Sequence, residues 1–168
     1  MKTLILAAAL TAAPALAALA DAPGITVTDA YARSTNPRSG AVFMTVANAN
    51  AADCRITAAT ADVTPRAELH THAEENGMMK MTPVEVVTIP AGGTHALERG
   101  GDHVMLMALE TPLKDGDKVA LTLDLGACGT LPVEAVVDNK RPASGHAGGH
   151  AGGHAGGHAG HTMPMPAN

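Results

Sequence analysis

Turn signals recur at short intervals between residues 21 and 140 and divide this part of the chain into short runs. Examples are Asn36-Pro37, Asn76-Gly77, Gly92-Gly93 and Asp115-Gly116. The runs between such turns are rich in β-branched or alternating apolar residues, and they cover 25–31, 41–46, 84–89, 104–109, 119–125 and 131–137. Runs of this length and spacing predict an all-β sandwich or barrel rather than a helical or βαβ domain. A stretch of about 120 residues can bury one such core, but not two.

The first twenty residues are expected to be a signal peptide. Lys2 is followed by an uncharged run that ends at Ala18-Leu19-Ala20, a cleavage site of the A-x-A type. A transmembrane anchor is the alternative, but Pro14 interrupts the run and alanine is only weakly hydrophobic. We therefore expect a periplasmic protein that begins near Asp21, with no membrane span in the mature chain.

The overall composition excludes other classes of protein. The chain has 168 residues, a formal net charge of -5 and 46% hydrophobic residues. A chain with this charge lacks the basic surface that binds phosphates, so nucleic acid is not an expected partner. The hydrophobic fraction is too high for a chain that is disordered throughout.

The composition changes near Arg141-Pro142. Residues 142–168 contain a glycine-rich four-residue repeat and are expected to form a disordered tail, separate from the β domain at 21–141. The repeat can be an incidental low-complexity linker. Its high local density of imidazoles favours binding of Cu(II), Ni(II) or Zn(II), which should weaken as the pH falls through about 6.5. The predicted tail ligands are His146, His150, His154, His158, His161, Met163 and Met165.

A second group of potential metal ligands lies inside the β domain, around Asn76-Gly77. If this dipeptide forms a two-residue hairpin turn, residues pair when their numbers sum to 153. His72 then lies opposite Met81, and His70 lies one step along the same face, diagonal to Met81. These three side chains are thus expected to share one ion.

A third group occupies the segment from His103 to Met107. Strand alternation places His103, Met105 and Met107 on one face, whereas Val104 and Leu106 point into the core. Any single methionine here can be core filler, and any single histidine can be a surface residue. We accept that simpler interpretation for Met44, as a core residue, and for His95, as a surface residue.

The mixture of imidazoles and thioethers indicates which ion is bound. Thioether sulfur favours Cu(I) over Zn(II), whereas imidazoles alone do not discriminate in that direction. Methionine also avoids the disulfide formation to which a thiolate site is exposed in an oxidising compartment. The β domain is therefore expected to bind Cu(I).

These residues carry a family resemblance. His70, ten intervening residues, Met81, twenty-one intervening residues and then His103-Val104-Met105 form an H-x10-M-x21-H-x-M pattern. The pattern is similar to that of the periplasmic copper chaperones of the PCu(A)C type. The segments around it also resemble the family, namely 31–33, 41–46, 77–85, 89–94 and 100–107. The resemblance covers roughly 25–137 and extends to the tail, because some members have a His- and Met-rich C-terminal extension.

The resemblance implies a cupredoxin-like Greek-key β-barrel that binds one Cu(I) ion through His70, Met81, His103 and Met105. It also implies delivery of copper for the CuA centre of cytochrome c oxidase, often beside a Sco-type protein. One position departs from the family, which often has a methionine close after the first histidine, where this chain has Thr71 and His72. His72 can replace or supplement His70. Further candidate ligands are Met79 and Met107.

The two cysteines, Cys54 and Cys128, are predicted to form one structural disulfide, because the chain is exported and no other cysteine is present. There is no C-x-x-C motif of a thiol oxidoreductase. A blue copper carrier needs a histidine a few residues after its cysteine, but the next histidine after Cys128 is His146. No enzymatic activity is therefore predicted.

Two hypotheses of function remain. The first is a metallochaperone that holds Cu(I) in the β domain, captures Cu(II) through the tail and passes copper to a partner. The second is a general periplasmic buffer or scavenger of copper, zinc or nickel, in which the tail does the binding. Removal of the residues after Arg141 distinguishes them.

Overall fold

The computed structural model describes residues 22–142, and this part of the chain is almost entirely β-structure. Its strands are β1 (Ile25–Asn36), β2 (Ser39–Asn48), β3 (Cys54–Ile56), β4 (Ala58–Ala61), β5 (Arg66–Glu75), β6 (Met78–Pro83), β7 (Val87–Ile89), β8 (Thr94–Leu97), β9 (His103–Met107), β10 (Lys118–Asp124) and β11 (Thr130–Val137). The 3-10 helix η1 (Gly126–Cys128) precedes β11. The predicted all-β class is confirmed. The predicted signal peptide at 1–20 and the ligands of the tail lie outside the described residues.

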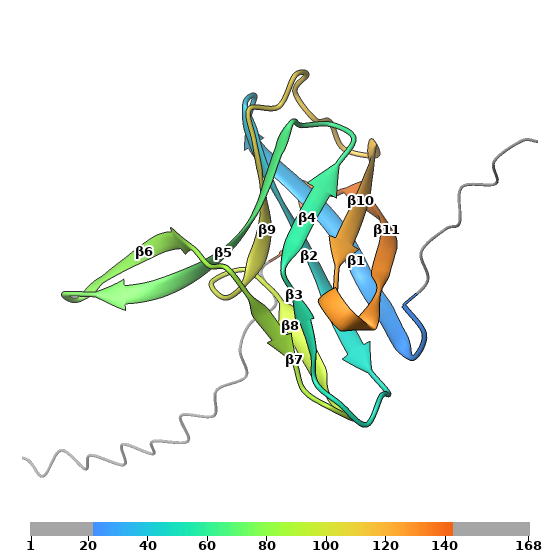
Figure 1. The fold of residues 1–168 in the computed structure, drawn as a ribbon. Helices are drawn as coiled ribbons and strands as arrows, with labels where there is room; N and C mark the ends of the chain where they lie inside the picture. The colour runs from blue at the N-terminus through green and yellow to red at the C-terminus, as the bar shows by residue number, and fades with distance from the viewer. Residues whose placement is uncertain (1–21, 143–168) are drawn as a thin grey trace, which may run out of the picture.

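Most strands belong to one curled sheet, with the order β4-β10-β11-β1-β2-β9-β5-β6 and with β8 paired to β2. β1 and β11 run parallel, while every other pair in this sheet is antiparallel. β4 stands at one end of the order but packs against β5 near the other end, so the sheet wraps around a core (Figure 1). Only β3 and β7 form a separate small sheet within the described residues. This closure leaves few strand edges exposed.

The core follows from strand alternation. In β10 every second residue is buried, namely Val119, Leu121 and Leu123, and their neighbours are exposed. Val104 and Leu106 of β9 are fully buried, as predicted. Met44 is only 3% exposed and belongs to the same core cluster, so its interpretation as a core residue is confirmed.

Two predicted strands are shorter in the structure. Of the run 84–89, only Val87–Ile89 is a strand, and it pairs with β3 rather than with the main sheet. The run 104–109 ends as a strand at Met107, because Ala108 takes a positive φ of 57° that breaks the extended backbone.

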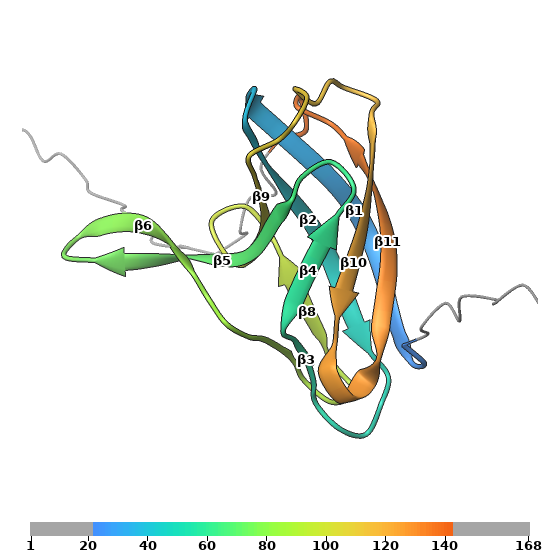
Figure 2. The ribbon, with the colours of Figure 1, turned by 45° about the horizontal axis from the view of Figure 1, so that its top comes forward.

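The hairpin of β5 and β6 projects from the barrel as an arm (Figures 1 and 2). Asn76 and Gly77 both have positive φ, 54° and 77°, as a type I′ turn requires. Because this turn fixes the register, His72 pairs with Met81 and His70 with Pro83. The predicted register, in which paired residue numbers sum to 153, is confirmed. Among the strands of residues 22–142, β6 is the last in the sheet and pairs with β5 alone.

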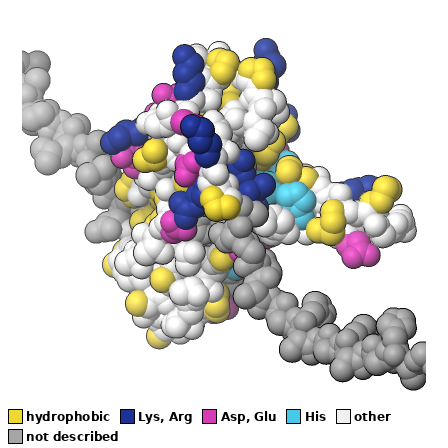
Figure 3. Space-filling view, turned by 180° about the vertical axis from the view of Figure 1, so that it is seen from behind, with side chains coloured by type: hydrophobic (Ala, Val, Ile, Leu, Met, Phe, Trp, Pro, Cys, Tyr) yellow, Lys and Arg dark blue, Asp and Glu magenta, His cyan; other side chains and the backbone are white. Residues whose placement is uncertain are grey.

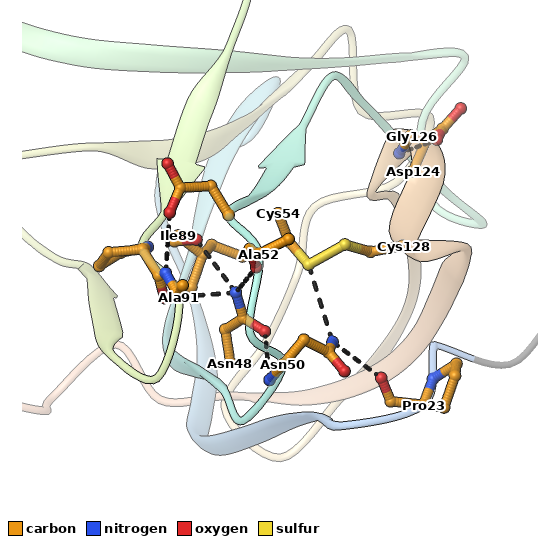
Figure 4. The surroundings of a disulfide bond; sticks show 12 residues. Pro23, Asn48, Asn50, Ala52, Cys54, Ile89, Ala91, Asp124, Gly126 and Cys128 are labelled. Carbon is orange, nitrogen blue, oxygen red and sulfur yellow. Dashed lines mark hydrogen bonds between the residues drawn. A yellow bond between two sulfur atoms is a disulfide. The ribbon is translucent and has the colours of Figure 1, made fainter.

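A disulfide closes the other end of the barrel. Cys54 at the start of β3 is bonded to Cys128 of η1, with their Cα atoms 5.8 Å apart (Figure 4). Next to it, the buried side chain of Asn48 donates hydrogen bonds to the carbonyl oxygens of Ala52 at 2.9 Å and Ile89 at 3.2 Å. The predicted disulfide is present, and it ties the small sheet to the turn before β11. None of the helices among residues 22–142 is long and apolar enough to cross a bilayer.

Candidate metal centre

Three neighbouring strands bring the predicted ligands to one face of the sheet. β5 lies between β6 and β9, so the residues of the hairpin arm meet those of the barrel there. His70 pairs with His103 across β5 and β9, and His72 pairs with Met81 across β5 and β6. Met105 lies two residues beyond His103, in register with Glu68. Residues that are distant in sequence thus gather where the arm leaves the barrel.

His103 is the most deeply buried of these ligands, with 1% of its surface exposed. Its Nδ1 lies 3.0 Å from the carbonyl oxygen of Gly101. A carbonyl oxygen only accepts, so Nδ1 carries the proton and Nε2 carries the lone pair. That Nε2 is buried and has no hydrogen-bond partner. Burial lowers the pKa of His103, which keeps the ring in the neutral form that binds metals.

His70 is held by a neighbouring carboxylate. Its Nε2 lies 3.0 Å from Oε2 of Glu68, which accepts the hydrogen bond and leaves the lone pair on Nδ1. This Nδ1 is also buried without a partner. Hydrogen bonds from His70 and then Arg66 lower the pKa of Glu68, so it remains a carboxylate. A carboxylate on the far nitrogen of a histidine is the usual support of a metal-binding imidazole.

His72 and Met81 approach from the arm. The ring of His72 lies 5.3 Å from the ring of His103, compared with 6.0 Å between the rings of His70 and His103. Nδ1 of His72 is buried and unpartnered as well. Met81 is 45% exposed, so its thioether is accessible from solvent.

The remaining predicted ligands lie farther along the same face. Met105 is partly buried and lies beside Ala41 of β2. Met107 pairs with Arg66, and Met79 pairs with Glu74 farther out on the arm, where Met79 is 61% exposed. His95 does not join the cluster, because its Nε2 lies 2.8 Å from Oδ2 of Asp102.

Two adjoining hollows open over this cluster. One, of about 390 Å³, is lined by Ala41, Phe43, His72, Met81, Arg99, Gly100 and His103. The other, of about 300 Å³, contains Met105 together with Met81, Phe43 and Arg99. A larger hollow of about 570 Å³ lies over β4, β10 and β11, but no histidine or methionine lines it.

An aromatic row closes the inner side of the cluster. Phe43 lies 5.9 Å from the ring of His103, and Tyr31 lies 5.1 Å from Phe43. These are the only two aromatic residues of the Phe, Trp and Tyr types in the chain, and both shield the site. Ring packing of this kind keeps water away from the buried imidazole.

The potential metal donors on this face are histidine nitrogens and methionine thioethers. Within residues 22–142, no three side chains among His, Cys, Asp and Glu come close enough together to hold an ion. Methionines lie beside the histidines on this face: Met81 lines the hollow that contains His72 and His103, and Met105 lines the adjoining one. Four buried side-chain nitrogens lack a hydrogen-bond partner in the described residues, and three of them belong to His70, His72 and His103. Buried polar groups are normally satisfied, so these three nitrogens are candidate metal-binding atoms.

Sequence reasoning missed several residues of the site. Glu68 could have been found, because alternation places it on the same face as His70, two residues away. Phe43 and Tyr31 could not, because their role depends on the pairing of β1, β2 and β9. Arg33 and Arg99 carry no local signal either, yet both line the hollow that contains Met105.

Comparison with solved structures defines the class. The copper-bound PCuAC domain from PmoF2 matches with a TM-score of 0.57 at 16% identity, over 68% of this chain and 92% of that domain, and shows the shared fold. Apo-DR1885 from Deinococcus radiodurans is 34% identical with a TM-score of 0.54, over 82% of this chain and 95% of that one. The Cu(I) form of DR1885 is 37% identical with a TM-score of 0.52, over 71% and 83%. The fold is the cupredoxin-like barrel of the PCu(A)C copper chaperones, as the sequence predicted.

Sequence comparison narrows the class to one family. The model of the family described as "Putative lipoprotein LpqE-like" matches residues 25–137. A protein of Leifsonia xyli subsp. xyli that is also described as a putative lipoprotein is 32% identical over 117 residues, which are 69% of this chain and 70% of that protein. The chain belongs to this LpqE-like family, within the PCu(A)C class.

Proposed function

We propose that this chain is an exported copper metallochaperone that holds one Cu(I) ion where the β5–β6 arm meets the barrel. The observation that carries the proposal is the set of buried, unpartnered imidazole nitrogens of His70, His72 and His103. A buried polar atom without a partner costs about 1–3 kcal/mol. An ion removes that cost for each nitrogen that it binds, and the thioether of Met81 lies in the same hollow as the rings of His72 and His103.

The proposed ligands are His70, Met81, His103 and Met105, with His72 able to replace or supplement His70. The hydrogen bonds of Gly101 and Glu68 support His103 Nε2 and His70 Nδ1 as the binding atoms. The shorter ring distance to His103 supports a role for His72. We assign Met79 and Met107 as auxiliary ligands for loading or transfer, because both lie on the same face.

Neutral ligands suit a protein that has to give its ion away. Imidazole and thioether donors leave the complex with the single positive charge of Cu(I). A thiolate acceptor neutralises that charge and binds Cu(I) as a soft ligand. Transfer to such an acceptor is therefore downhill, and the protein needs no chemical reaction of its own.

We extend the proposal to partners and to the tail. Delivery for the CuA centre of cytochrome c oxidase, alongside a Sco-type protein, follows from the family resemblance. The histidines and methionines of residues 142–168 supply the donors for Cu(II). The solved structure of DR1885 with Cu(I) supports the oxidation state proposed for the domain.

We also propose that the mature protein is periplasmic. The lipoprotein names of the family and of the relative from Leifsonia xyli support export. The two cysteines of this chain are bonded to each other, so neither carries a lipid. Cleavage after Ala20 by signal peptidase would start the mature protein near Asp21.

Copper titration by oxidation state tests the proposal. The unmodified protein is expected to bind one Cu(I) tightly in competition with a chromogenic Cu(I) chelator, with sulfur and nitrogen neighbours in X-ray absorption. His70→Ala combined with Met105→Ala should abolish that binding and leave Cu(II) uptake by the tail intact.

A truncated chain that ends at Arg141 separates the two hypotheses of function. It should keep the Cu(I) site and lose Cu(II) binding. If the truncated chain binds no Cu(I) tightly, while the isolated tail takes up zinc, nickel and copper alike, the protein is a metal buffer and not a copper chaperone.

A further inference from the structure

A groove lined by arginines runs beside the candidate metal centre. Arg33 and Arg99 are its two charged lining residues, and Phe43, Met81 and Met105 line it as well. The groove continues into the hollow that contains His72 and His103, because Ala41, Phe43, Met81 and Arg99 line both. Figure 3 shows basic side chains gathered on the barrel next to the histidines at the base of the arm.

Among residues 22–142, no carboxylate forms an ion pair with either arginine of this groove. Arg99 is exposed and forms no ion pair with another described residue. Arg33 donates from Nη2 to the carbonyl oxygen of Asn139 at 2.7 Å, but its Nε is buried and has no partner among the described residues. No carboxylate of a described residue pairs with Arg33 either, so the charges of both arginines remain available to an anionic group.

The neighbouring acidic residues already have partners. Glu68 binds Arg66 and His70, and Asp102 binds His95. Asp29 pairs with Arg141, whose guanidinium also lies 4.1 Å above the ring of Tyr31. The groove is therefore a positive region on a chain whose formal net charge is -5.

This charge works against the binding of a cation. Burial raises the pKa of Tyr31. The charges of Arg141, Arg99 and Arg33 oppose that rise in the pKa, which shows that their field reaches the aromatic row of the site. Two guanidinium groups beside a Cu(I) site disfavour the ion electrostatically, so they do not serve ion capture. Their field suits recognition of a partner with negative charge.

We propose that the arginine-lined groove is the docking surface for an acidic segment of a copper-accepting protein. Carboxylates of that segment pair with Arg99 and Arg33 while its own copper ligands approach over Met81, the exposed methionine shared by both hollows. The inference rests on the proposed function. The tail of this chain does not fit the groove in the same way, because residues 143–168 contain no aspartate or glutamate.

Pairing of charges in the arginine-lined groove makes the rate of copper transfer depend on whether the partner has an acidic segment. Attraction between the groove and the acidic segment speeds the encounter and fixes its orientation. Once docked, copper stays as Cu(I) and moves from imidazole and thioether donors to two thiolates, whose protons pass to the buffer.

Transfer to two synthetic peptides tests the proposal. Both peptides contain the same pair of cysteines, flanked in one by aspartates and glutamates and in the other by lysines. The full-length protein loaded with Cu(I) is mixed with each peptide anaerobically, and the transfer rate is followed at several salt concentrations. The acidic peptide should accept copper about tenfold faster or more at low salt, and the difference should shrink as salt screens the charges.

Arg99→Glu should remove or reverse this preference. Arg55→Glu is the matched control, because it makes the same change of charge at an exposed arginine of β3 that lines neither hollow. Equal rates for the two peptides, or an unchanged preference in Arg99→Glu, would overturn the docking surface. The Cu(I) affinity of each protein is measured separately, so that failure of the unmodified protein to bind Cu(I) counts against the proposed function instead.

Discussion

His70 and His103 face each other across strands β5 and β9, and each has one buried ring nitrogen without a hydrogen-bond partner. The opposite nitrogen of each ring is fixed, by Glu68 in one case and by the carbonyl of Gly101 in the other. Both rings therefore hold a lone pair ready for an ion, and the pairing of the two strands sets the distance between them. The following predictions depend on this arrangement.

Replacing a thioether by an isosteric hydrocarbon should remove copper affinity without unfolding the protein. Met81→Leu and Met105→Leu are each expected to weaken Cu(I) binding by about tenfold or more, or ~1.4 kcal/mol. A Leu-for-Met exchange usually costs less than about 1.5 kcal/mol of folding stability. Competition titration and thermal unfolding measure the two effects. Met44→Leu in the core is the control, and an equal loss of Cu(I) affinity there would contradict the assignment of the ligands.

The carboxylate of Glu68 should increase the Cu(I) affinity, because it orients the ring of His70. Glu68→Ala is expected to lower the Cu(I) affinity by about 10- to 100-fold, which is typical for loss of a group that orients a metal-binding histidine. Glu68→Gln keeps an acceptor for His70 Nε2 and should lose less. Glu134→Ala removes a glutamate that pairs with Lys118 on the exposed side of the barrel and should change nothing. Titration of the three variants shows the order, and equal affinities in all three would refute the orienting role.

Burial of His103 should make the apoprotein less stable in mild acid. Burial lowers its pKa in the folded state, while in the unfolded chain the pKa is about 6.5. The unfolded state therefore binds the proton first. The contribution of His103 to the free energy of unfolding is fully present above about pH 6.5. It decreases as the pH falls toward the pKa of the folded state, by at most about 1.4 kcal/mol per pH unit for this one group.

Urea unfolding between pH 7.5 and 5.5 measures this slope, in a range above the titration of most carboxyl groups. His103→Gln should flatten the slope, whereas His95→Gln should keep it. A slope that persists unchanged in His103→Gln would assign the acid sensitivity to other groups.

The disulfide should stabilise the fold and leave the metal centre alone. Cys54 and Cys128 are 74 residues apart in sequence, and closing a loop of this length is worth about 4 kcal/mol in the chain-entropy model. The double variant Cys54→Ser and Cys128→Ser should lose stability of that order in denaturant titration. Its Cu(I) affinity, measured while it is folded, should match that of the unmodified protein, because β3 and η1 carry no candidate ligand.

The sequence predicted the local parts of the fold and the site. Asn76-Gly77 has the chemistry of a type I′ turn, and that turn fixes the pairing of His72 with Met81. Strand alternation likewise predicted that Val104 and Leu106 are buried. Both inferences need only residues close together in the chain.

The contacts between residues far apart in the chain could not be predicted from the sequence. The pairing of His70 with His103 joins strands that are separated by β6, β7 and β8, and no turn fixes that register. No local signal predicts the parallel pairing of β1 with β11 either. Nor does one predict that Arg33 and Arg99 line the hollow that contains Met105. The run 84–89 looked like one strand, but only its last three residues pair, and with β3, which the hydrophobic pattern alone did not reveal.

The rigidity of the projecting arm should depend on whether copper is bound. In the described part of the chain β6 pairs with β5 alone, so the backbone of the arm depends on one ladder of hydrogen bonds. An ion held between Met81 and His103 adds a second tie, from the outermost strand of the sheet to a strand of the barrel. The amide protons of the arm should then exchange with solvent more slowly in the copper form. A partner that touches the arm would thus encounter a stiffer hairpin on a full carrier than on an empty one.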